Sequence, residues 1–174
     1  LCYAAAGWRV LLAARNEEEA RRNADDISAR TASEVTVHRI DILETDSFEA
    51  FVDGLPQLPD TVVCVVGELG DQARGQKDHA HATRILRTNF EGPALLLGLF
   101  AERFLERGSG TLVGVSSVAG DRGRGSNYLY GAAKAGFSAF LSGLRNRLAP
   151  AGLRVITVKP GFVRTQMTAG MRLP

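Results

Sequence analysis

The chain has 174 residues, of which 45% are apolar and 23% are charged, ordinary values for a soluble globular domain with a real core. A net charge of +2 without a clustered basic face argues against a nucleic-acid partner, and the longest apolar runs are far too short to span a membrane. The two cysteines, Cys2 and Cys64, form no spaced framework, so we expect free thiols in a reducing cytoplasm.

Strands and helices are predicted to alternate along the chain. The opening LCYAAAG has the composition of the last turns of a helix that ends at Gly7, so we expect the native chain to extend upstream. Short apolar or alternating runs predict strands over 8–14, 34–40, 61–66, 111–116 and 153–158. Helical composition or spacing predicts helices over 16–30, 47–52, 80–107 and 128–148.

This alternation predicts an α/β fold with a Rossmann-like, doubly wound parallel sheet flanked by helices on both faces. We expect a single domain over residues 1–174. Ligands bind such sheets beyond the carboxyl ends of the strands. Five candidate residues stand at those predicted ends: Arg15, Asp41, Gly67, Ser117 and Pro160.

The stretch VSSVAGDRGRGSNYLYGAAK carries the residues with the clearest chemistry. Tyr130 and Lys134 are four residues apart at the start of a predicted helix, so they share one face of it. A free tyrosine has a pKa of about 10, and an ammonium one turn away is expected to lower it. Ser117 ends the preceding strand, where its hydroxyl would steady a reacting carbonyl oxygen. The rival phenol, Tyr128, is followed four residues later by Ala132.

The spacing of these residues resembles the short-chain dehydrogenase/reductase family. In that family a Ser lies thirteen residues before the Tyr, an Asn lies twenty-eight before the Ser, and Pro-Gly follows the Tyr by thirty. Here the same spacings select Ser117, Asn89 and Pro160-Gly161, with Thr165 further on. The resemblance implies that Tyr130 is the general acid/base of hydride transfer between a nicotinamide cofactor and a carbonyl or alcohol.

The same resemblance implies further roles. Lys134 would also grip the nicotinamide ribose, and Asn89 would hold a water that links Lys134 to solvent. The implied cofactor contacts are Asp41 and Ile42 at the adenine, Tyr130 and Lys134 at the ribose, and Pro160, Gly161 and Thr165 at the nicotinamide. The family usually has Asn-Ala-Gly after the fourth strand, whereas this chain has Val65-Val66-Gly67, so Gly67 keeps the register and the Asn is missing.

Arg15 favours NADP over NAD. An NAD enzyme needs a carboxylate at the end of the second strand to bind the ribose 2′-hydroxyl. Here Ala14 stands at that position and Arg15 follows, and a guanidinium suits a 2′-phosphate. A solvated surface arginine is the alternative interpretation. The resemblance implies that residues 1–174 are one NAD(P)-binding domain that is incomplete at both ends, without its first strand and its C-terminal substrate segment. It also implies that the glycine-rich phosphate loop lies upstream of this sequence.

The sequence allows several alternatives for the substrate, and the family resemblance bears on the oligomeric state. Arg122 and Arg124, between Ser117 and Tyr130, suit a phosphate or carboxylate on a small-molecule substrate, or are simply solvated. The same stretch is similar to reductases of polyprenyl-phosphoryl keto-pentoses, and a non-catalytic NADP-binding sensor is another alternative. His79 and His81 face different ways on a helix, which argues against a metal site. The resemblance implies a homodimer or homotetramer through the helices 80–107 and 128–148.

Overall fold

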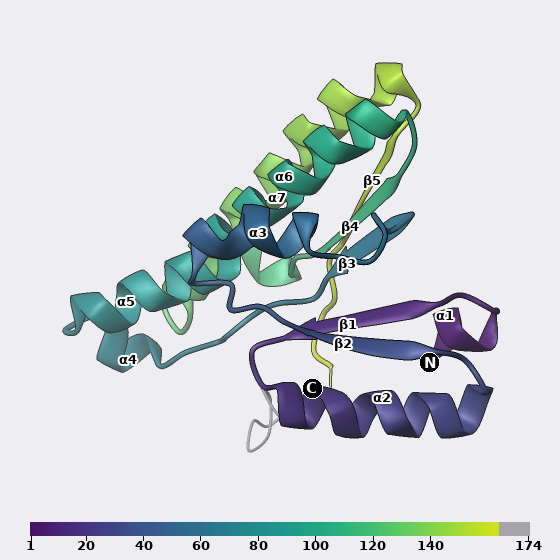
Figure 1. Ribbon diagram of the computed structural model, residues 1–174. Helices are drawn as coiled ribbons and strands as arrows, with labels where there is room; N and C mark the ends of the chain where they lie inside the picture. The colour runs from purple at the N-terminus through teal and green to yellow at the C-terminus, as the bar shows by residue number, and fades with distance from the viewer. Residues whose placement is uncertain (164–174) are drawn as a thin grey trace. The chain divides into compact units, whose positions relative to one another are not determined.

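The computed structural model describes residues 1–163. It divides into two compact units, Leu1–Ser47 and the chain from Phe48 onward, and each is an arrangement of parallel strands and helices (Figure 1). The parallel pairing and the alternation of strands with helices confirm the predicted α/β class. Among the described residues, no helix is both long and apolar enough to cross a membrane.

The first unit is a two-stranded parallel sheet that one long helix covers. Its elements are α1 (Cys2–Ala5), β1 (Val10–Ala14), α2 (Glu17–Thr31), β2 (Val35–Arg39) and the 3-10 turn η1 (Thr45–Ser47). Gly7 has φ of +83°, so the first helix ends in the left-handed turn that the sequence predicts. The Asn16 side chain accepts from the backbone N–H of Glu19 at 3.2 Å and starts α2.

The second unit is a three-stranded parallel sheet in the order β3-β4-β5, and its long helices α6 and α7 run side by side (Figure 1). The strands are β3 (Thr61–Cys64), β4 (Thr111–Val115) and β5 (Arg154–Val158). The helical elements are α3 (Phe48–Asp53), α4 (Gln72–Gly75), α5 (His79–Leu86), the π-helical turn η2 (Arg87–Glu91), α6 (Gly92–Arg107), η3 (Val118–Gly120), α7 (Tyr128–Leu148) and η4 (Ala149–Ala151).

The structure contains two features that the sequence did not predict. The run predicted as one helix over 80–107 is helical throughout but includes the π-helical turn η2, because Pro93 has no N–H to donate and its ring displaces the carbonyl four residues earlier, that of Asn89. The segment after β3, where no helix was predicted, contains the short helix α4, which Asp71 caps by accepting from the backbone N–H of Arg74 at 3.0 Å.

Side chains of helix α7 pack directly onto the middle of β4, because Gly114 in that strand has no side chain. A Cβ built at Gly114 would lie 2.4 Å from the Cδ1 atom of Leu141. The core around this contact consists of side chains with no more than 1% of their surface exposed: Leu97, Phe104, Leu112, Phe137, Leu141 and Leu148. The packing of these side chains therefore fixes the distance between α7 and the end of β4, where the candidate site lies.

Candidate active site

The candidate site of the second unit lies where parallel strands end and α7 begins. Ser116 and Ser117 follow β4 directly, Val66 and Gly67 follow β3, and Pro160 follows β5. The carboxyl ends of parallel strands share one edge of a sheet, and the hydrogen bonds support this placement. The N–H of Ser116 donates to Val158 O at 2.7 Å, and the N–H of Val118 donates to Pro160 O at 3.2 Å.

Ser117 and Tyr130 form a hydroxyl pair at this edge. Ser117 has an extended backbone, and its Oγ accepts from the N–H of Ala119 at 3.1 Å, which starts η3. The Ser117 side chain also hydrogen-bonds Tyr130. Burial raises the pKa of the Tyr130 phenol above its ordinary value, and the hydrogen bond to Ser117 opposes this shift only in part. The phenol is therefore protonated at neutral pH.

Lys134 is held by backbone carbonyls at two strand ends. Its residue surface is 2% exposed, and its Nζ donates to Val66 O at 3.2 Å and to Val115 O at 3.1 Å. The ammonium lies 5.8 Å from the centre of the Tyr130 ring and 5.7 Å from that of Phe137. Burial lowers the pKa of Lys134 to about 8, a shift that the nearby Cys64 opposes.

The expectation that Lys134 lowers the pKa of Tyr130 was wrong for this structure. The pKa of Tyr130 is raised, and the main cause is its burial. The physical reason is that the phenolate loses hydration in the packed site.

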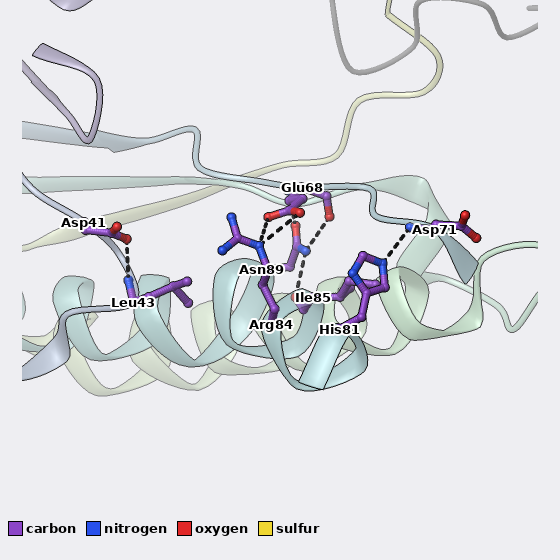
Figure 2. A network of polar contacts seen from close by, with 8 residues as sticks. All are labelled: Asp41, Leu43, Glu68, Asp71, His81, Arg84, Ile85 and Asn89. Carbon is purple, nitrogen blue, oxygen red and sulfur yellow. Dashed lines mark hydrogen bonds and ion pairs between the residues drawn. The ribbon is translucent and has the colours of Figure 1, made fainter. Parts of the chain in front are cut away.

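Asn89 belongs to a separate hydrogen-bond network that fixes the segment after β3 (Figure 2). Its fully buried amide accepts from the N–H of Glu68 at 3.0 Å and donates to Glu68 O at 2.7 Å and to Ile85 O at 2.8 Å. The Arg84 guanidinium pairs with the Glu68 carboxylate at 3.0 Å. Asn89 thus ties the segment after β3 to α5, and its implied water-holding role stays a prediction.

The other predicted cofactor residues are distributed over both units. In the second unit, Gly161 has open space around a built Cβ and adjoins Pro160. In the first unit, Arg15 is exposed at the end of β1, and Ile42 is 9% exposed. The Asp41 carboxylate accepts from the N–H of Leu43 at 3.0 Å (Figure 2). Thr165 lies outside the described residues.

Several residues that shape the site carry no signal in the sequence motif. The carbonyls of Val66 and Val115 bind Lys134 through the backbone, which no side-chain pattern can reveal. Burial raises the pKa of the Cys64 thiol. A hydrogen bond with the Val66 backbone and the charge of Lys134 oppose part of this increase. Ser116 matches none of the motif spacings, yet alternation along the strand places its hydroxyl on α7.

The chemistry of this donor set fits the ribose of a nicotinamide cofactor. A lysine ammonium has three N–H donors, and Lys134 gives two of them to backbone carbonyls. The third is left for a hydroxyl of a bound molecule, next to the phenol of Tyr130. Across residues 1–163, no group of three His, Cys, Asp or Glu side chains is placed to hold a metal ion.

Burial of Lys134 predicts a stability that rises with pH. The pKa of this lysine is about 8 in the folded chain and 10.5 in an exposed lysine, so between these values the unfolded chain binds more protons. The free energy of unfolding should therefore increase from pH 8 to pH 10. The complete shift of the pKa corresponds to an increase of about 3 kcal/mol. Urea unfolding should show this rise in the wild type and in Lys77→Met, an exposed control, but not in Lys134→Met. Parallel curves for all three proteins would contradict it.

Comparison with known proteins gives the family. The family model described as short chain dehydrogenase matches residues 2–173. An uncharacterized oxidoreductase of Mycobacterium tuberculosis is 40% identical over 174 aligned residues, which cover 96% of this chain and 68% of the relative. An acetoacetyl-CoA reductase of Allochromatium vinosum is 32% identical over 97% of this chain and 63% of its own length.

A solved structure, an actinorhodin polyketide ketoreductase with NADPH, superposes with a TM-score of 0.89 at 27% identity, over 98% of this chain and 67% of that one. This likeness confirms the predicted Rossmann-like fold. The chain spans about two thirds of the length of these relatives. With a family model that matches nearly every residue and relatives of this identity, the chain belongs to the short-chain dehydrogenase/reductase family of oxidoreductases.

Proposed function

We propose that this protein is an NADP-dependent oxidoreductase that interconverts a carbonyl compound and an alcohol, with Tyr130 as the general acid/base. The observation that carries the proposal is the grouping of Ser117, Tyr130 and Lys134 at one edge of the sheet, where a hydroxyl, a phenol and an ammonium adjoin. A bound nicotinamide would supply the hydride for reduction or accept it in oxidation.

The pKa directions suit proton donation to a carbonyl oxygen. The buried phenol is protonated at neutral pH, so it is ready to protonate an oxygen that gains negative charge. The Ser117 hydroxyl would hold that oxygen beside the phenol. Lys134 is mostly charged at pH 7, because its pKa is about 8, and its third N–H donor would bind a ribose hydroxyl of the cofactor beside the phenol. Alcohol oxidation needs the phenolate at the outset, so its rate should increase with pH.

The preference for NADP rests on Arg15. Its side chain is exposed, whereas Arg21 and Arg22 on the helix that follows are paired with Glu17 and Glu18. A guanidinium free of a carboxylate can bind a phosphate with two parallel hydrogen bonds. The ketoreductase that this chain resembles is named with NADPH, which supports the same cofactor here.

A substrate with an acidic group is a second, more specific candidate. Arg122 and Arg124 lie on the loop between Ser117 and Tyr130, and within the part of the chain that the structure describes neither has an acidic partner. The Arg124 Nε is buried without a hydrogen-bond partner, an arrangement that costs free energy until a ligand or water satisfies it. A coenzyme A thioester, as in the name of the related acetoacetyl-CoA reductase, or a phosphorylated keto-sugar would supply the anion.

Replacing the phenol tests the reaction. Tyr130→Phe should lower kcat for NADPH-dependent reduction of ketones and aldehydes about 10²- to 10⁴-fold, because the proton donor is lost while the ring remains. Loss of absorbance at 340 nm measures the rate, and Tyr128→Phe is the matched control on the same helix. NADPH binding without any turnover in the wild type would favour the sensor alternative.

Replacing Arg15 tests the cofactor. Arg15→Ala should raise KM for NADPH about 10- to 100-fold, because one charge-assisted hydrogen-bond pair to the 2′-phosphate is lost, and should leave KM for NADH nearly unchanged. Arg22→Ala, on the exposed face of α2, is the control. Equal effects on both cofactors would count against a 2′-phosphate contact.

Replacing both loop arginines tests the acidic substrate. The Arg122→Gln/Arg124→Gln protein should show KM for acetoacetyl-CoA raised about 10- to 100-fold, with the kinetics of a neutral ketone unchanged. Arg154→Gln, at the opposite end of β5, is the control. A proportional loss for both substrates would mean that the loop only supports the fold.

A further inference from the structure

A buried cluster of hydroxyl groups holds the backbone of Lys134. The Ser116 Oγ donates to Lys134 O at 2.9 Å, the Ser138 Oγ donates to the same carbonyl at 2.9 Å, and the two hydroxyls lie 2.7 Å apart. Ser116 is 3% exposed and Ser138 is half-buried, so the Ser116 hydroxyl is shielded from water, where hydrogen bonds are strengthened and unmade ones are costly. The two hydroxyls have two protons for these three contacts, so either both donate to the Lys134 carbonyl or one donates to the carbonyl and the other to the neighbouring hydroxyl oxygen.

Both the backbone and the side chain of Lys134 are therefore bound to the end of β4. Its carbonyl accepts from Ser116, and its Nζ donates to the carbonyl of Val115, the residue directly before Ser116. A flexible lysine stem normally loses about 2 kcal/mol of side-chain entropy when it is fixed. Here consecutive residues of one strand end fix the backbone and the ammonium together, so the position of Nζ depends on the position of the Lys134 carbonyl.

Close packing against η3 restrains the same peptide bond. A Cβ built at Gly120 would lie 2.6 Å from the N atom of Ala135 and 2.8 Å from the C atom of Lys134. One built at Gly131 would lie 2.8 Å from Ala119 O. The peptide that joins Lys134 to Ala135 is thus in close contact with η3 and is also hydrogen-bonded to Ser116 and Ser138, so a shift of α7 would break contacts of both kinds.

We propose that Ser116 and Ser138 are positioning residues that set the place of the Lys134 ammonium beside Tyr130. The two adjacent serines after β4 have different partners. Ser117 hydrogen-bonds the phenol of Tyr130, whereas Ser116 binds the backbone of α7, the helix that contains Tyr130 and Lys134. The catalytic part of this inference rests on the proposed function. The structural part, a restrained Lys134, does not.

The restraint is tested by the reactivity of the lysines, because the chain has only three. Acetylation of Lys77, Lys134 and Lys159 by acetic anhydride is followed by mass spectrometry of peptides. Ser116→Ala and Ser138→Ala should each accelerate modification of Lys134 at least fivefold and leave Lys77 and Lys159 unchanged. Ser138→Thr, which keeps the hydroxyl, should restore protection. Ser142→Ala, exposed and one turn further along α7, should have no effect.

Leu148→Ala is the control for a general loss of stability, because Leu148 is fully buried and lies at the far end of α7. This variant should unfold at lower urea concentration and still protect Lys134. Equal acceleration in Leu148→Ala and in the serine variants, or unchanged protection in both serine variants, would overturn the proposal. If Ser116→Ala does not fold, Ser138→Ala, at a half-buried helix position, decides the test alone.

Kinetics test the catalytic consequence. In both serine variants kcat for reduction of a neutral ketone should decrease at least tenfold, KM for the ketone should change less than twofold, and Ser138→Thr should recover the rate. Loss of lysine protection with wild-type kcat would refute the positioning role. If the wild type reduces no carbonyl compound, the proposed function fails, and the acetylation result still decides whether Ser116 and Ser138 restrain Lys134.

Discussion

The site depends on the ammonium of Lys134, a buried cation that two strand-end carbonyls satisfy. A buried charge without partners would cost several kcal/mol, so the ends of β3 and β4 and the first turns of α7 must keep a fixed arrangement. Burial lowers the pKa of this lysine to about 8, close enough to neutrality that its charge responds to its surroundings. The same packing raises the pKa of Tyr130 and leaves the phenol protonated.

The arrangement is possible because small residues let a helix approach a strand and a turn closely. Gly114 leaves room for Leu141, and Gly120 leaves room for the peptide after Lys134. The cost of a flexible backbone at these positions is balanced by the packing of Phe137 and Leu141, both no more than 1% exposed. The geometry of the candidate site is therefore a consequence of how tightly the second unit packs.

Neighbouring polar residues of the site have different hydrogen-bond partners. Ser117 and Ser116 are adjacent in the chain, and their hydroxyls reach different partners because successive residues of an extended segment point to opposite sides. Asn89 completes the frame from another direction, with three hydrogen bonds that hold the segment after β3. Ser116, Ser117 and Asn89 thus each have defined hydrogen-bond partners, and fixed polar groups of this kind are what a pre-organised catalytic site requires.

The sequence by itself determined the family and the alternation of strands and helices, because side-chain spacing and hydrophobic period are local properties of the chain. It also predicted Ser117, Tyr130 and Lys134 as the residues of the site. Tertiary structure alone decided the pKa directions, since burial has a larger effect than the one-turn separation of Tyr130 and Lys134. It also decided the hydrogen bond between Ser116 and the Lys134 carbonyl, because these two residues are 18 positions apart in the chain.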